Sequence, residues 1–256
     1  MIKVKDLHKQ FGFKHVLCGI NFEVRDGETL AIIGSSGTGK SILLKNIVGL
    51  IKPTSGAVYI DGVNVTNCSA EELMNTHKKT GYVFQESALF DSMTIFENVA
   101  FGLKMLTKYN EEEISQRVSQ CLKMVGLKNV ERLKPSELSG GMKKRAALAR
   151  AIAYQPKYIF YDEPTTGLDP IMSDAISDLI INLRENLKVT SIVVTHDMKS
   201  AYKIADRIIM LYKGEVVFEG TPQETKKTKN PVVRQFVEGS SHGPIQTERN
   251  FEMDGL

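Results

Sequence analysis

A glycine-rich loop that ends in lysine and serine is the strongest chemical signal in this chain. Residues 34–41 read Gly-Ser-Ser-Gly-Thr-Gly-Lys-Ser, which fits the phosphate-binding pattern G-x-x-x-x-G-K-[ST]. Residues 28–33 predict a buried strand before the loop, and apolar residues at helical spacing predict a helix after it, up to Gly49. A loop in this setting directs backbone N–H groups and the positive end of a helix at phosphate. We therefore expect a binding site for a nucleoside triphosphate.

Two carboxylates at the end of a second buried strand supply chemistry that the loop lacks. The strand predicted at residues 158–161 is followed directly by Asp162 and Glu163. Open α/β sheets bind ligands at the carboxyl ends of their strands, so these side chains should lie near the loop. Asp162 suits a Mg²⁺ ligand, directly or through water, and Glu163 can polarise a water for attack on a γ-phosphate. The pair predicts the second half of a nucleotide site.

A helix that opens on two glycines is a third unusual feature. Residues 138–142 read Leu-Ser-Gly-Gly-Met, and Ser139 is the expected N-cap of the helix that follows. Glycine weakens a helix by about 1 kcal/mol at an interior position, so a purely structural role leaves this cost unexplained. Bare backbone N–H groups at a helix start can contact an anion, which explains the glycines well.

Composition excludes several classes of protein. The 256 residues include 42% hydrophobic and 25% charged residues, which is ordinary for a soluble globular protein. The net charge of +3 is too balanced to indicate a nucleic-acid partner, and we expect the basic runs 143–145 and 226–229 to be solvated surface. No apolar run is long enough to span a membrane, the first residues lack a secretory pattern, and the three cysteines are far apart, which indicates a reducing cytosol.

The predicted elements describe an α/β core that is interrupted by helices. Residues 1–33 alternate apolar and polar and predict antiparallel strands, whereas residues from about 88 to 155 predict mostly helices. Further strands are expected at 58–60, 81–84, 158–161, 191–195 and 208–211. Helices between the later strands indicate a mainly parallel sheet. From about Thr221 the chain becomes polar, which suggests an extension beyond the core.

The motifs and their order resemble the nucleotide-binding subunits of ATP-binding-cassette (ABC) transporters over about residues 1–220. The resemblance rests on the loop 34–41, Gln85, residues 138–142, 161–164 and 167–169, and His196. It implies an α/β P-loop NTPase (RecA-like) core with an antiparallel β subdomain and an inserted α-helical signature subdomain. The nucleotide-binding domain would then span residues 1–225, with the helical subdomain at about 88–155 and a C-terminal extension at 226–256.

The same resemblance implies a head-to-tail homodimer that encloses two ATP molecules with Mg²⁺. Catalysis would fall to Glu163 as general base, with Lys40, Gln85 and His196, the last of which contacts the γ-phosphate. Ser41, Gln85 and Asp162 would hold the metal, and Phe11 would stack on adenine, although Phe13 is a nearby alternative. The residues expected to contact ATP are Phe11, Gly34, Ser35, Ser36, Gly37, Thr38, Gly39, Lys40, Ser41, Ile42, Ser139, Gly140, Gly141 and Asp169.

Departures from the common family pattern indicate a branch. Met142 stands where most members carry Gln, and both the tail 231–245 and the segment 85–99 look like those of Mla/Mce-type lipid transport ATPases. By that resemblance the partners would be a multi-spanning permease, an Mce-domain substrate-binding protein and a small STAS-domain protein, at the cytoplasmic face of the inner membrane. The apolar run after Gln85 is the expected dock for the permease, with Phe90 and Met93 as contacts.

One alternative to the lipid branch stays open, and two other classes of protein are disfavoured by the sequence. Met142 can also be a neutral replacement, in which case another transporter branch, such as a polar solute importer or a lipoprotein exporter, is the rival. A stand-alone nucleotide switch would have no use for residues 139–141, and a non-transport cassette protein would usually carry two cassettes, coiled-coil insertions or zinc cysteines.

Overall fold

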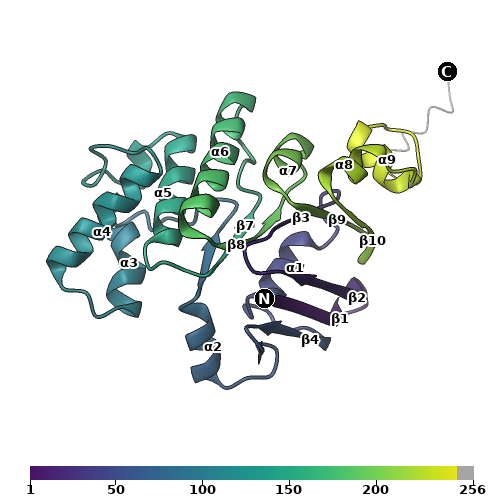
Figure 1. The fold of residues 1–256 in the computed structure, drawn as a ribbon, viewed down its shortest axis with the longest axis horizontal. Coiled ribbons are helices and arrows are strands. Elements are labelled where there is room, and N and C mark those ends of the chain that lie inside the picture. Colours follow the sequence, from purple (N-terminus) through teal and green to yellow (C-terminus); the bar gives the residue numbers. More distant parts are fainter. Residues whose placement is uncertain (247–256) are drawn as a thin grey trace.

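Two β-sheets of different kinds form the frame of the molecule (Figure 1). The structure is a computed structural model and describes residues 1–246. The antiparallel sheet has the order β2-β1-β4-β5, with β1 at Ile2–Phe11, β2 at Lys14–Val24, β4 at Ser55–Ile60 and β5 at Val63–Asn64. The larger sheet has the order β10-β9-β3-β8-β7-β6, with β3 at Thr29–Ile33, β6 at Thr80–Val83, β7 at Tyr158–Asp162, β8 at Thr190–Val194, β9 at Arg207–Tyr212 and β10 at Glu215–Gly220. Its neighbouring strands are parallel except for β9 and β10.

Strand β3 belongs to the parallel sheet, which corrects the expectation that residues 1–33 form antiparallel strands throughout. It lies between β8 and β9 and pairs with both in parallel. All five of its residues are buried, and a strand that is covered on both faces reads as a continuous apolar run rather than an alternating one. The expected α/β fold, with its antiparallel subdomain and inserted helices, is otherwise confirmed.

Nine α-helices connect and cover the strands within residues 1–246. They are α1 at Lys40–Ile47, α2 at Ala70–His77, α3 at Ile95–Leu106, α4 at Glu111–Met124, α5 at Gly140–Ile152, α6 at Pro170–Leu187, α7 at Met198–Ile204, α8 at Pro222–Lys227 and α9 at Pro231–Glu238. A short polar side chain caps the N-terminus of each of them except α1, which begins after Gly39, and α2, α3 and α4 each begin with a reciprocal capping box. Within these residues no helix combines the length and the apolar character needed to cross a bilayer.

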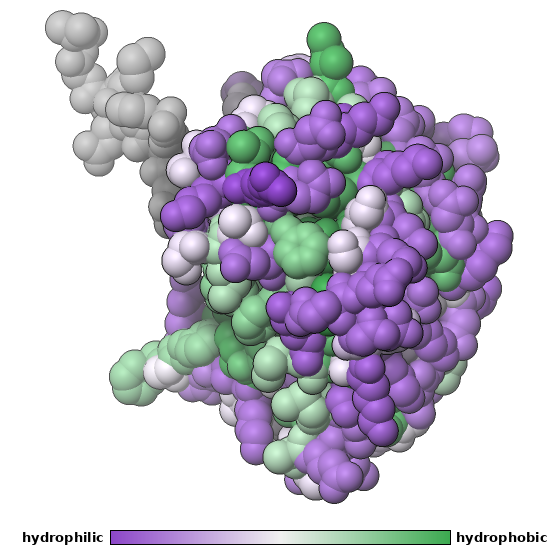
Figure 2. Space-filling model, turned by 90° about the vertical axis from the view of Figure 1, so that its left-hand side faces the viewer, coloured by the Kyte–Doolittle hydropathy of each residue, from purple (hydrophilic) through white to green (hydrophobic). Residues whose placement is uncertain are grey.

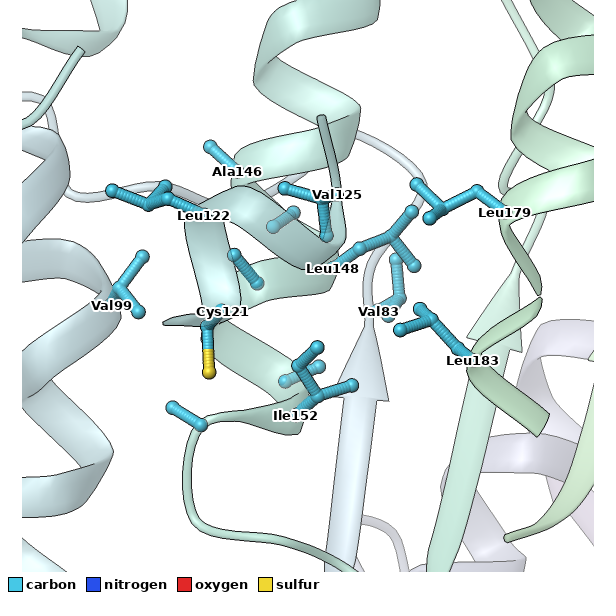
Figure 3. Close-up of a cluster of buried hydrophobic side chains, with 14 of the residues drawn as sticks. Val83, Val99, Cys121, Leu122, Val125, Ala146, Leu148, Ile152, Leu179 and Leu183 are labelled. Carbon is cyan, nitrogen blue, oxygen red and sulfur yellow. The ribbon is translucent and has the colours of Figure 1, made fainter. Parts of the chain in front are cut away.

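The inserted helices share one apolar core with the parallel sheet. Helices α3, α4 and α5 form one side of the molecule (Figure 1), and Figure 3 shows Val99, Cys121 and Ile152 from these helices in one cluster with Val83 of β6 and Leu183 of α6. The helical block is thus packed directly on the edge of the sheet that ends in β6.

The C-terminal helices also pack on the core. Val233 of α9 is fully buried in a cluster with Ala31 of β3 and Ala201 of α7. The Gln235 side chain accepts a hydrogen bond from the Ile245 backbone at 2.6 Å, which ties the following segment to α9. The proposed extension is therefore joined to the core at least as far as Ile245, and its last part, residues 247–256, lies outside the described residues.

Removal of a buried ring from β7 should destabilise the protein strongly. Phe160 is 0% exposed and packs on the side of the sheet that faces α1, so Phe160→Ala leaves a cavity and should lower the free energy of unfolding by about 3–5 kcal/mol. Phe13→Ala is the matched control, because Phe13 is 101% exposed and its loss should change stability by less than about 0.5 kcal/mol. Denaturant unfolding of both variants measures the difference, and equal midpoints would contradict the assigned packing.

Candidate active site

The glycine-rich loop has a backbone path that only glycine follows easily. It runs from the end of β3 to the first residue of α1, and the backbone φ is +149° at Gly34 and +96° at Gly39. A Cβ at Gly34 would lie 2.5 Å from the carbonyl oxygen of Leu211, and one at Gly39 would lie 2.9 Å from a methyl group of Val16. The loop therefore fits closely against its neighbours at both glycines. The loop leads directly into the N-terminus of α1, where backbone N–H groups favour binding of an anion.

Lys40 spans the space between the loop and the carboxylates of β7. Its ammonium donates to the carbonyl oxygens of Gly34 at 2.8 Å and Ser35 at 3.0 Å and lies 3.8 Å from Oε1 of Glu163. Burial lowers the pKa of Lys40, while the carboxylates of Glu163 and Asp162 oppose that change. A buried ammonium satisfied mostly by carbonyl oxygens can exchange them for phosphate oxygens, which are stronger acceptors.

A hydroxyl and a carboxylate at the site suit Mg²⁺. The Ser41 hydroxyl donates to Oδ1 of Asp162 at 2.7 Å, and the Tyr82 hydroxyl donates to Oδ2 at 3.1 Å. Magnesium prefers oxygen ligands and usually takes few of them from the protein, with water and substrate phosphates supplying the rest. Ser41 and Asp162 therefore fit this ion. Gln85 lies shortly after β6 and is exposed, so its amide oxygen is accessible to an ion bound at this site.

Glu163 is held in an uncommon backbone conformation beside a histidine. Its φ is +50°, and its N–H donates to the carbonyl oxygen of Val194 at 2.9 Å. Its Oε2 accepts from the hydroxyl of Thr166 at 2.9 Å and lies 2.8 Å from Nδ1 of His196. The carboxylate is buried while the imidazole is half exposed, so the pair lies at the boundary between the interior and the open site. This arrangement suits proton transfer from a water molecule.

A shallow cavity beside the loop is lined by one of the two aromatic residues that were candidates for contact with adenine. The cavity has a volume of about 320 Å³ and is lined by Phe11, Lys14, Val16, Gly37, Gly39, Lys40, Ser41 and Ile42. Phe13 points into solvent and does not line the cavity. A base placed here would meet the Phe11 ring, so the structure favours the choice of Phe11. Lys14 and Val16 were missed from the sequence, although their alternate positions on one strand were the available signal.

The structure does not bring the signature residues to the phosphate loop of the same chain. Ser139 caps α5 as expected, and its hydroxyl accepts from the N–H of Met142 at 3.3 Å. Asp169 caps α6 by accepting from the N–H groups of Ile171 at 2.9 Å and Met172 at 3.0 Å. Within residues 1–246, no hydrogen bond or ion pair joins Ser139, Gly140, Gly141 or Asp169 to the loop. A second chain would be needed for these groups to meet a nucleotide bound there.

Lys144 is a site residue that the sequence did not predict. We expected residues 143–145 to be solvated, but Lys144 is only 7% exposed. Its ammonium donates to the backbone carbonyl of Gln85 and lies 3.5 Å from that of Glu163. The expectation failed because a run of basic residues on a helix presents successive side chains in different directions, and one of them points inward. No pattern in the sequence alone separates Lys144 from its neighbours.

An apolar groove lies close to Gln85, on the outer side of the site. Its volume is about 570 Å³, and it is lined mainly by apolar residues that include Leu50, Phe84, Phe90, Phe101, Met105 and Tyr154. Figure 2 shows apolar side chains gathered on the side of the molecule where α3 and α4 lie. The predicted contact Phe90 lines the groove and is 42% exposed, whereas Met93 does not line it. Met105, which is 70% exposed, does line the groove.

Comparison with known proteins connects this geometry to one family. Residues 17–166 match the protein family described as "ABC transporter". The chain is 43% identical to "Protein TRIGALACTOSYLDIACYLGLYCEROL 3, chloroplastic" of Arabidopsis thaliana, with 96% of this chain and 76% of that protein covered. It is 42% identical to "Intermembrane phospholipid transport system ATP-binding protein MlaF" of Haemophilus influenzae, with 96% and 93% covered. It is also 40% identical to "Probable ribonucleotide transport ATP-binding protein mkl" of Mycobacterium leprae, with 95% and 70% covered.

Solved structures show the same fold. One of them is the dimeric post-hydrolysis state of an ATP-binding cassette bound to ADP and Pi. It superposes with a TM-score of 0.80 at 37% sequence identity and covers 87% of this chain and 99% of the cassette. The bound products in that structure belong to the reaction for which the loop and the carboxylates of the present chain are suited.

Proposed function

The chain belongs to the ABC transporter family as an ATP-hydrolysing subunit, and we propose that it drives transport of phospholipid or a related lipid through a partner permease. The observation that carries the lipid assignment is the 42% identity to MlaF, which extends over 93% of that protein. The chloroplast relative carries a galactolipid in its name, which supports the same class of cargo. Met142 at the end of the signature agrees with this branch.

We assign the steps of hydrolysis to the residues that surround the loop. Lys40 would bind the β- and γ-phosphates, and Glu163 would accept a proton from the attacking water, with His196 beside it as a contact for the γ-phosphate. Ser41, Asp162 and Gln85 would hold Mg²⁺, which supplies positive charge against the phosphate oxygens when it is bound. The negative charge of the transferring phosphoryl group and of the leaving oxygen would be stabilised in the transition state by the Lys40 ammonium, which lowers the barrier to hydrolysis.

We propose a homodimer as the working form, because four of the fourteen expected nucleotide contacts lie away from the phosphate loop of the same chain. Ser139, Gly140 and Asp169 are exposed, and they lie on α5 and at the start of α6 rather than on the loop. Two chains placed head to tail would bring these residues of one chain to the loop of the other. The free N–H groups at the start of α5 would then meet the γ-phosphate.

The permease would dock in the apolar groove beside Gln85 and act from the cytoplasmic face of the membrane. The groove is lined by residues of α3 and by Phe84 and Ala88, which lie on either side of Gln85 in the segment that follows β6. Phe90 and Phe101 have ring centroids 5.0 Å apart and form an aromatic wall. A short helix of the permease with an apolar face would fill this space, as helix-in-groove contacts do elsewhere.

Charges in the groove should detach the chain from its permease. The double change Phe90→Asp with Met105→Asp should leave ATP binding by the isolated chain unchanged, because neither residue lines the nucleotide cavity. It should reduce recovery of the permease in a detergent pull-down at least tenfold, since a buried carboxylate without a partner is costly. Met74→Asp is the control, because Met74 is 52% exposed and lies outside the groove. Recovery of the permease at the control level would place the dock elsewhere.

The rival assignment is transport of a polar solute, which the name of the mycobacterial relative supports. The two are separated by reconstitution of the chain with its co-purified membrane partners, among which we expect an Mce-domain protein and a STAS-domain protein. ATP-dependent movement of a fluorescent phospholipid between vesicles, absent with Glu163→Gln, would support the lipid assignment. Uptake of labelled ribonucleotide without lipid movement would support the rival.

A further inference from the structure

A buried lysine on the signature helix joins two chain segments whose side chains are assigned to the reaction. Lys144 lies on α5, its ammonium donates to the backbone carbonyl of Gln85, and it lies 3.5 Å from that of Glu163. Gln85 follows β6 and Glu163 follows β7, which are adjacent parallel strands. One side chain from a third element thus holds the two segments at the point where each leaves the sheet.

The surroundings of Lys144 indicate a dedicated role for its charge. Lys144 is 7% exposed, and within residues 1–246 its ammonium forms no salt bridge, so backbone carbonyls are its described partners. Burial lowers the pKa of Lys144, and the nearby carboxylates of Glu86, Glu163 and Asp162 oppose that change. A buried ammonium is costly to desolvate, and an apolar side chain would be expected here if the position served packing alone.

The backbone of Glu163 needs external support. Its φ of +50° lies in the left-handed region, which residues other than glycine adopt only when the surrounding structure enforces it. The N–H of Glu163 is fixed by the carbonyl of Val194, and its own carbonyl faces Lys144 and the N–H of Thr166. Loss of the ammonium would remove one of the contacts that keep the carbonyl, and therefore the carboxylate, in place.

A second cation on α5 holds the same segment further along. Arg150 donates to the carbonyl oxygens of Ser87 at 2.8 Å and Ala88 at 2.6 Å, and both of these residues also have positive φ. Helix α5 therefore fixes the path from Gln85 to the apolar groove at two places. Lys144 is the one of these two contacts that also reaches Glu163.

We propose that Lys144 is a positioning residue for ATP hydrolysis, which fixes Glu163 and Gln85 relative to each other through their backbone carbonyls. This inference rests on the proposed roles of those two residues. Lys144→Met keeps an unbranched side chain that is one atom shorter and removes its donors, so Glu163 can relax from its uncommon conformation. Because a displacement of about 1 Å at a reacting group can lower a rate by about 10²-fold, we expect kcat to fall by about 10²-fold with the KM for ATP changed less than threefold.

Three companion variants distinguish positioning from a general structural defect. Lys144→Arg keeps the charge and the donors of the side chain. Its kcat should be at least fivefold higher than that of Lys144→Met. Lys123→Met, at an exposed position on α4, should hydrolyse ATP like the parent. In a chain that already carries Glu163→Gln, adding Lys144→Met should lower the residual rate by less than about tenfold, because the part of its effect that passes through Glu163 is already lost and only the part that passes through Gln85 remains.

The outcomes distinguish failure of this inference from failure of the assignment of Glu163 as the general base, on which it rests. If Glu163→Gln alone keeps the parent rate, the assignment of the base is wrong and the role of Lys144 is overturned with it. If Glu163→Gln is inactive while Lys144→Met retains more than a third of the parent kcat, only the role of Lys144 is overturned. A loss that appears chiefly in KM, or one that multiplies fully with the loss in Glu163→Gln, also overturns it.

Discussion

Replacement of Glu163 by Gln should lower the turnover of ATP by about 10²–10⁴-fold, because it removes the group that accepts the proton of the attacking water. The change keeps the shape of the side chain. The hydroxyl of Thr166, now 2.9 Å from Oε2, can still donate to the amide oxygen. ATP binding should persist, since Lys40 and the loop are untouched. Steady-state phosphate release gives the rate, and size-exclusion chromatography with ATP should show the dimer accumulating.

A conservative change elsewhere controls for this experiment. Glu185→Gln makes the same chemical change at an exposed position on α6 and should leave the rate unaltered. An ATPase rate for Glu163→Gln within a factor of two of the parent would reject the assignment of the base. A large loss of ATP binding would instead show that the carboxylate serves chiefly to hold Lys40, which lies 3.8 Å away.

The arrangement of two mutations between the chains of a dimer should decide its activity. With Lys40→Ala on one chain and Ser139→Arg on the other, one site keeps both parent residues and the second site loses both. With both changes on the same chain and a parent partner, each site loses one residue. If the site is shared between chains, the first heterodimer should hydrolyse ATP and the second should be reduced at least about 10²-fold, because phosphate contacts are lost at both sites.

Heterodimers purified through two different tags allow this comparison. The dimer of a parent chain with a Lys40→Ala chain has one intact site and sets the activity that a single site can provide. If the two arrangements give the opposite order, each site is built within one chain and the head-to-tail dimer is wrong. The structure motivates the experiment, because the hydrogen bond of the Ser139 side chain in the described part of the chain is made to its own helix.

Much of the fold could be predicted because its signals are local. The alternation of β7, with Tyr158 and Phe160 on one face and Ile159 and Tyr161 on the other, follows from the pleat of a strand. Ser139 was identified as a cap because the preference for serine depends on only three following residues. The pairing of β3 was not predictable in this way, since it depends on strands more than 150 residues away in sequence.

The sequence alone determined which chemical groups the protein has for nucleotide chemistry: a phosphate loop, a carboxylate pair and a glycine-opened helix. These depend on residue type and short spacing, which a chain carries with it whatever its folded form. Only the tertiary structure decided which groups meet, namely that His196 contacts Glu163, that Phe11 rather than Phe13 lines the cavity, and that Lys144 is buried between two carbonyls. Contacts of this kind join distant segments, and their geometry is set by how the helices and the sheet pack together rather than by any local pattern.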